Sequence, residues 1–217
     1  MGDGELRDAL EQIAEIRRQM ARTEVFRGFR AVPVACSGLL AWSAGAFQAA
    51  FLPEPTSRLG SYLTLWVGAA VVSAAIAGGF MVDRMRRGGS SWTRNTTRLA
   101  IEQFLPCVVA GGLLAALAFS QPEIAWLLPG LWQLLFGLGI FATGFLLPTA
   151  VRGVAAWYLA MGIASLAIAR GESALAPWAM AVPFGVGQLL AAAVLYWTLE
   201  RGGGPQWPSS PPDDRAS

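Results

Sequence analysis

Six long stretches of the chain contain no charged residue. They cover 31–53, 59–82, 103–122, 124–151, 153–169 and 173–199 and are 17 to 28 residues long. A hydrocarbon core of about 30 Å needs about 20 apolar residues in a helix, and a helix satisfies its own backbone hydrogen bonds there. We therefore expect an all-α polytopic membrane protein, a bundle of six transmembrane helices. The expected spans are about 31–52, 61–82, 99–120, 124–147, 150–169 and 174–199.

The composition argues against a water-soluble helical protein. Hydrophobic residues make up 54% of the chain and charged residues 14%, and the uncharged stretches lack the polar face that a soluble helix needs. A cleaved secretory signal peptide is a poor interpretation of the first span, because thirty residues that include six acids precede it. The lipid bilayer is thus the expected surroundings of all six spans.

The arginines predict how the spans are oriented. All 16 basic residues are arginine, and fourteen of them fall on one side of the predicted membrane. Only Arg58 and Arg170 fall on the other side. By the positive-inside rule, the amino terminus, the 83–98 connection and the tail face the cytoplasm.

Several classes of chemistry are excluded by residues that the chain lacks. Without lysine or histidine there is no Schiff-base lysine, imidazole base or histidine metal ligand. Cys36 and Cys107 are too few for a disulfide framework or a thiolate metal site and fall in apolar runs. The net charge of +2 does not suggest nucleic-acid binding. We therefore assign no catalytic residue, cofactor or metal ligand and expect a protein that is not an enzyme.

Small residues and short connections predict some helix contacts. A connection as short as Leu147–Thr149 makes the fourth and fifth spans antiparallel neighbours. A weak repeat pairs GLWQLL at 130–135 with GVGQLL at 185–190, and we expect it to arise by chance. Small residues recur every four positions on the first two spans and predict a tightly packed hairpin between them. These residues are Ser37, Ala41, Gly45 and Ala49 on the first span and Ala70, Ala74 and Gly78 on the second.

Four polar residues within or beside the spans are candidate intramembrane contacts. Glu102 and Arg152 begin the third and fifth spans, so they form an ion pair if those helices touch, and otherwise reach water separately. Gln133 and Gln188 lie deeper, where lipid cannot satisfy their amides. Interhelical hydrogen bonding is the favoured role of the two glutamines, and lining a small-ligand cavity is the alternative.

Residues 1–30 read as an amphipathic cytoplasmic helix, and residues 200–217 as a disordered tail rich in glycine and proline. Acids balance arginines in the helix, which favours a protein contact over a purely electrostatic membrane anchor. The contact is either a second copy, another protein or the 83–98 connection, and an interfacial helix lying on lipid is the alternative. Its apolar face consists of Leu6, Ala9, Ile13, Ile16 and Met20.

Three short motifs carry a family resemblance. They are IRRQMART at 16–23, SGLLA at 37–41 and WTRNTTRL at 92–99. With them the chain resembles a loosely defined group of uncharacterised bacterial six-span membrane proteins, often encoded beside a winged-helix transcriptional regulator. The resemblance implies a bacterial inner-membrane location and a sensor or membrane-partner role, and it carries no catalytic residues.

Two functions remain from these observations. The first is a non-enzymatic regulatory or sensory membrane component that uses the amino-terminal helix as its protein contact. The second is a small transporter or lipophile-binding bundle built around Gln133 and Gln188. A membrane enzyme that uses Glu102 as its acid is a remote third, because no second chemical group accompanies Glu102.

Overall fold

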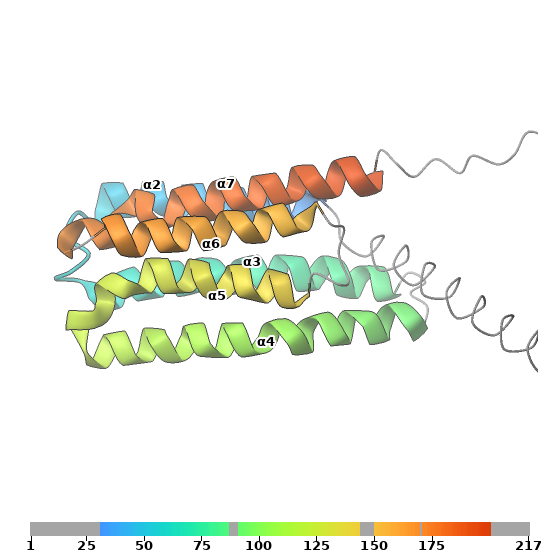
Figure 1. Ribbon diagram of the computed structural model, residues 1–217, viewed down its shortest axis with the longest axis horizontal. Helices are drawn as coiled ribbons and strands as arrows, with labels where there is room; N and C mark the ends of the chain where they lie inside the picture. Colours follow the sequence, from blue (N-terminus) through green and yellow to red (C-terminus); the bar gives the residue numbers. More distant parts are fainter. Residues whose placement is uncertain (1–30, 87–90, 144–149, 170, 201–217) are drawn as a thin grey trace, which may run out of the picture.

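The computed structural model describes residues 31–86, 91–143, 150–169 and 171–200, and the long elements in these ranges are all helices. Figure 1 shows them running along one common axis. The six long helices are α2 (Ala31–Phe51), α3 (Leu59–Arg86), α4 (Ser91–Ser120), α5 (Leu128–Ala142), α6 (Val151–Ile168) and α7 (Pro177–Leu195). Short turns η1 (Pro122–Leu127) and η2 (Gly171–Leu175) precede α5 and α7, and the π turn η3 (Tyr196–Glu200) follows α7.

The prediction of an all-α bundle of six membrane-spanning helices is confirmed. Six helices are long and apolar enough to cross a bilayer. The amphipathic face of Leu6, Ala9, Ile13, Ile16 and Met20 lies outside the described residues, as does the tail from residue 201. The helices that can span are Ala31–Phe51, Leu59–Asp83, Arg98–Ser120, Pro122–Ala142, Val151–Ile168 and Ser173–Thr198.

Prolines mark where several helices begin. Pro122, Pro129 and Pro177 occupy the first or second position of η1, α5 and α7. Proline is tolerated there because the first N–H groups of a helix have no intrahelical partner. The predicted fourth span at 124–147 therefore differs from the structure at both ends. It starts with the 3₁₀ turn η1, which the α-helix α5 follows, and α5 ends at Ala142.

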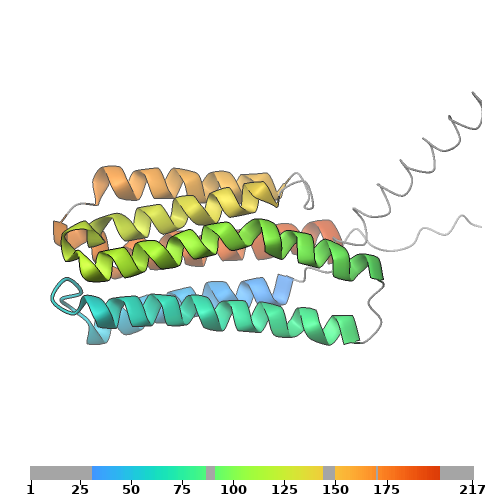
Figure 2. The same ribbon diagram turned by 90° about the horizontal axis from the view of Figure 1, so that it is seen from below.

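The helices pack side by side in the spatial order α3, α2, α7, α6, α5 and α4. Figure 2 shows the same bundle from below, with α3 and α4 along its near face. We call the end where α2 begins the terminal end, and the opposite end, which carries residues 52–58, 121–127, 169 and 171–176, the loop end. The predicted antiparallel contact between the fourth and fifth spans is present as the contact of α5 with α6.

Two helix pairs approach through glycine. On α2, a Cβ added to Gly45 would lie 2.5 Å from the Cβ of Ala181 on α7. Between α5 and α6, a Cβ added to Gly130 would lie 2.9 Å from the carbonyl oxygen of Gly162. A Cβ added to Gly162 would likewise lie 2.9 Å from the carbonyl oxygen of Gly130. No larger residue fits at such separations. Close backbone contact of this kind drives helix association in lipid, where helix surfaces gain no hydrophobic free energy.

The predicted hairpin seam between the first two spans is wrong. Ala41 and Gly45 are buried, but Gly45 contacts α7, and Ala49 is exposed. On α3, Ala70 and Ala74 are exposed, and no atom lies within 4 Å of a Cβ added to Gly78. The small face of α2 packs against α7 because Gly185 and Ala181 supply a matching small face there. Of the predicted stripe on α2, Gly45 approaches α7, and the other close approach of α2 to α7 is at Gly38, which lies outside the stripe.

The repeat GLWQLL and GVGQLL has a packing explanation at each copy. Gly130 of the first copy faces α6. In the second copy, the indole of Trp42 lies against Gly185, and the ring of Tyr158 lies against Gly187. Each glycine admits a different neighbour, so the shared letters do not mark equivalent positions in the bundle.

Candidate functional site

Gln48 joins three elements near the loop end of the bundle. Its side chain on α2 is 0% exposed. The amide nitrogen donates to the carbonyl oxygen of Leu175 at 2.7 Å, and the amide oxygen accepts from the indole N–H of Trp66 at 2.8 Å. Gln48 therefore bonds α2 at once to α3 and to η2, the turn that leads into α7.

Gln133 makes an equivalent clamp on the other side of the bundle. It is 0% exposed on α5, donates to the carbonyl oxygen of Ala179 at 2.8 Å and accepts from the hydroxyl of Ser165 at 3.3 Å. Pro183 lies inside α7 and has no N–H for the carbonyl four residues before it, which is that of Ala179. The amide of Gln133 takes the bond that the proline cannot make. These contacts are those of an interhelical clamp, the favoured of the two roles predicted for Gln133.

Gln188 is not brought to the same place as Gln133. It is half-buried at the contact of α2 with α7, where its Cβ lies 3.2 Å from the Cβ that Gly38 would carry. Gln133 reaches α7 at Ala179, nine residues earlier, which is about 13 Å of helix rise. The two glutamines therefore do not converge on one position along α7.

Glu102 pairs with Arg98 on its own helix. The guanidinium Nε donates to the Glu102 carboxylate at 2.6 Å, and both side chains are exposed. Arg152 is exposed at the start of α6. Glu102 therefore forms its ion pair with Arg98, four residues away on α4, and not with Arg152.

Two tryptophans bond backbone carbonyls across helices. The indole of Trp132 on α5 donates to the carbonyl oxygen of Gly111 on α4 at 3.0 Å. The indole of Trp157 on α6 donates to the carbonyl oxygen of Pro183 on α7 at 3.1 Å. Because water is scarce in a bilayer core, each indole N–H needs a protein partner, and these contacts fix neighbouring helices against each other.

Two tyrosine hydroxyls lack such a partner. Tyr62 on α3 and Tyr158 on α6 are both 0% exposed, and neither hydroxyl has a hydrogen-bond partner among the described residues. The ring of Tyr158 packs with Phe136 and Phe184, whose centroids lie 4.8 and 5.4 Å away. Tyr62 belongs instead to the buried cluster at the loop end.

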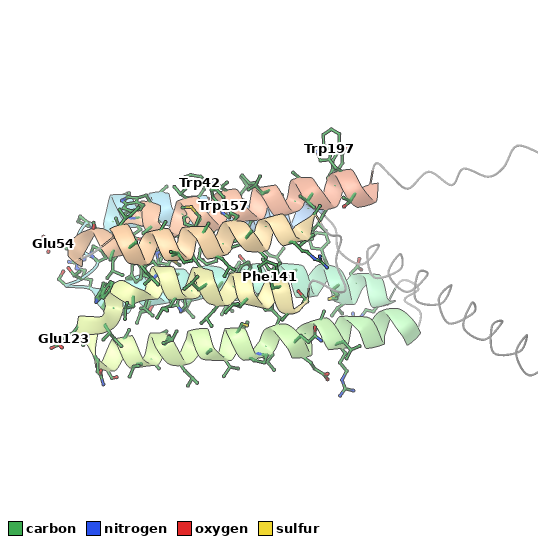
Figure 3. All side chains as sticks on the ribbon, viewed as in Figure 1. Trp42, Glu54, Glu123, Phe141, Trp157 and Trp197 are labelled. Carbon is green, nitrogen blue, oxygen red and sulfur yellow. The ribbon has the colours of Figure 1, made fainter. Side chains whose placement is uncertain are left out.

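A hollow of about 150 Å³ opens at the loop end. Three of its lining residues are buried, Leu59, Ala125 and Leu175, and we call these its floor. Of its other lining residues, Trp126 is half-buried, and Thr56, Pro122 and Glu123 are exposed. Figure 3 shows Glu123 and Glu54 at this end of the bundle and Trp197 toward the terminal end. Three separate connections between helices thus build one concave surface with a carboxylate at its edge.

The hollow is connected to the membrane interior through one of its floor residues. The carbonyl of Leu175 is the acceptor of Gln48, whose amide oxygen is the acceptor of Trp66. A displacement of η2 would therefore strain its hydrogen bond to Gln48 on α2. Through Gln48 it would also strain the hydrogen bond to Trp66 on α3. We take the hollow together with Tyr62, Gln48 and Trp66 as the candidate functional site.

The described part of the chain offers no set of metal ligands. It holds no group of three or more histidine, cysteine, aspartate or glutamate side chains placed to bind an ion. Cys36 on α2 and Cys107 on α4 are half-buried free thiols. Among the described residues, the polar side chains that line the hollow are those of Thr56, Glu123 and Trp126.

Sequence reasoning placed none of the residues of this site among its candidate contacts. A buried amide in a membrane span signals a protein contact, and Gln48 carries that signal as strongly as Gln133. The hollow has no comparable signal, because its residues come from three connections that are far apart in sequence. No family model, curated protein or solved structure matches this chain.

Proposed function

We propose that this chain is a non-enzymatic sensory or regulatory component of the bacterial cytoplasmic membrane. In this proposal both termini are cytoplasmic, and the apolar face of residues 1–30 contacts a cytoplasmic protein or a second copy. The loop end, with its hollow, then faces away from the cytoplasm. The count of fourteen arginines against two supports this orientation.

The observation that carries the proposal is the pair of hydrogen bonds at Gln48. They link Leu175, on the floor of the hollow, to α2 and α3. Helix α2 begins at Ala31, immediately after the segment that we expect to contact a partner. A change at the hollow therefore has a bonded route to the helix that leads into the amino-terminal segment. Allosteric coupling needs two sites and an element that both of them bias, and α2 is that element here.

Crosslinking in native membranes tests the proposal. We would crosslink three forms, the full chain, a chain lacking residues 5–22, and Gln48→Leu, and identify captured proteins by mass spectrometry. The full chain should capture a specific cytoplasmic protein or a second copy, and the truncated chain should lose it. Gln48→Leu should change the yield of the same capture without removing the protein from the membrane. Gln121→Leu, at an exposed glutamine of the loop end, is the matched control and should behave as the wild type.

A transcriptome comparison supplies an independent outcome. Cells that lack the gene and cells with the truncated chain should show the same changes relative to wild type, because the partner contact is absent in both. If the full deletion changes transcription and the truncation does not, residues 5–22 are not the regulatory contact. Capture of no specific partner by the full chain would overturn the proposal and favour ligand screening of the bundle.

A further inference from the structure

The described lining of the loop-end hollow carries one charge, and that charge is negative. Glu123 is exposed in this lining, and no ion pair involves it among the described residues. Arg58, a positive charge described at the same end of the bundle, lines a separate hollow. The loop-end hollow therefore favours a ligand that carries a positive charge.

The floor of the hollow restricts which cation fits. Its three side chains, Leu59, Ala125 and Leu175, are apolar, and their carbonyl oxygens are already hydrogen-bonded within the protein. The carbonyl of Leu175 accepts from Gln48 at 2.7 Å, and that of Ala125 accepts from the backbone N–H of Leu128. Leu59 is the first residue of α3, so its carbonyl is bonded within that helix. A primary ammonium has N–H donors that would lose water here without replacement, so the part of the ligand on the floor must be apolar.

We propose that the loop-end hollow binds a small quaternary ammonium ion, with its methyl groups on the apolar floor and its charge balanced by Glu123. Such an ion has no N–H to satisfy, and its charge is spread over methyl groups that tolerate an apolar surface. Trp126 lines the same hollow, and tryptophan is the side chain that attracts cations best through its ring. A cavity of about 150 Å³ holds a molecule the size of benzene, which is about the size of tetramethylammonium or choline. This inference rests on the proposed sensory function and names the chemistry that the sensor would detect.

Glu54 supplies a matched control at the same end of the bundle. It lies on the connection between α2 and α3 and, with Pro53 and Arg58, lines the separate hollow of about 240 Å³. Its carboxylate also accepts a hydrogen bond from the hydroxyl of Ser57 at 3.4 Å. Glu54 and Glu123 are both exposed, so replacing either by glutamine removes one surface charge and leaves the core intact. Of the two substitutions, only Glu123→Gln takes the charge from the proposed site.

Calorimetric titration of the purified full chain tests the site. The chain is held in micelles of an uncharged maltoside detergent, which brings neither charge nor ammonium, and is titrated with choline, dimethylbutanol and ethanolamine. Dimethylbutanol has the shape of choline with carbon in place of nitrogen, so wild type should prefer choline by about ten-fold because the alcohol lacks the charge. Ethanolamine has the charge without the methyl groups, and wild type should prefer choline over it by about five-fold because less apolar surface reaches the floor.

Substitutions then assign the recognition to named side chains. Glu123→Gln should bring the affinities for choline and dimethylbutanol within about two-fold of each other, and Glu54→Gln should leave the wild-type preference within about two-fold. Trp126→Leu should lower choline affinity by about three-fold and leave dimethylbutanol unchanged, whereas Trp126→Phe, which keeps a ring, should retain most of the preference. The proposal is overturned if wild type binds the three probes equally, or if Glu123→Gln and Glu54→Gln lower choline affinity to the same extent.

Two further arms identify the source of the ligand and separate the two proposals. If the hollow takes a lipid headgroup, adding phosphatidylcholine to the micelles should weaken choline binding by competition. If it takes a free quaternary ammonium ion, the added lipid should have no effect. A chain that binds no probe but still captures its partner overturns this inference alone. A chain that binds choline but captures no partner overturns the sensory function and leaves the site.

Discussion

Gln133 and Pro183 form a complementary pair of residues on neighbouring helices. The proline leaves the carbonyl of Ala179 without its helical N–H, and the amide of Gln133 bonds that carbonyl at 2.8 Å. Gln133→Leu should lower the free energy of unfolding by about 1–3 kcal/mol, because a buried carbonyl and the hydroxyl of Ser165 lose their partner. Unfolding in mixed micelles, followed by circular dichroism, measures the change.

A double-mutant cycle gives this prediction a specific control. In a Pro183→Ala background the backbone N–H at position 183 can bond the Ala179 carbonyl, so the loss caused by Gln133→Leu should shrink by about 1 kcal/mol. Gln188→Leu, at a half-buried glutamine of the same helix as Pro183, should change stability by less than about 0.5 kcal/mol. Equal losses in both backgrounds would show that Gln133 does not compensate for the proline.

Individual residues show how far sequence alone could go at this scale. That Gln133 faces protein follows from the inability of lipid to satisfy an amide, and the structure buries it completely. Its partner does not follow, because Ala179 is 46 positions away and contributes only a backbone carbonyl. The same holds for Gln48, whose partner Leu175 is 127 positions away. Backbone acceptors carry no residue-type signal.

Glycine contacts decide which helices pair. Gly45 of α2 faces Ala181 of α7 so closely that an added methyl group would lie 2.5 Å from the Ala181 Cβ. Gly45→Ala should therefore destabilise the bundle by about 1–3 kcal/mol through overpacking. Gly112→Ala is the matched control, since nothing lies within 4 Å of its added Cβ, and it should be neutral or slightly stabilising. Equal effects of the two substitutions on the unfolding midpoint would contradict the α2–α7 contact.

The pairing of elements was harder to predict than their existence. Length and lack of charge located six helices because both follow directly from bilayer thickness. The short connection at 147–149 also predicted the neighbours α5 and α6. The hairpin of α2 with α3 failed as a tight seam because several helices carry faces of glycine and alanine. A small face permits close packing with any other small face, and α7 supplied the better match.

The whole bundle divides into a buried part and a lipid-facing part. In the most apolar stretch of the span Ser173–Thr198, which contains α7, 44% of the residues are buried. The corresponding share is 6% for the span of α3 and 6% for the span of α4. Helix α7 thus joins the rest through α2 and α6, while α3 and α4 present most of their surface to lipid. The Gln48 contacts to Trp66 and Leu175 tie the exposed α3 to this inner part at the loop end. The loop end is therefore where α3 is bonded to the inner part of the molecule.

The orientation of the bundle is testable from its two ends. Cys36 and Cys107 are half-buried and are first replaced by alanine, which should be tolerated because buried cysteines act as small apolar residues. Single cysteines then replace Ser57, exposed at the loop end, or Ala150, exposed at the terminal end just before α6. Because fourteen of the 16 arginines fall on the terminal side, a maleimide that cannot cross membranes should label Ser57→Cys in intact cells. Ala150→Cys should react only after the cells are opened. The reverse pattern would place the hollow in the cytoplasm and remove the basis for an external signal.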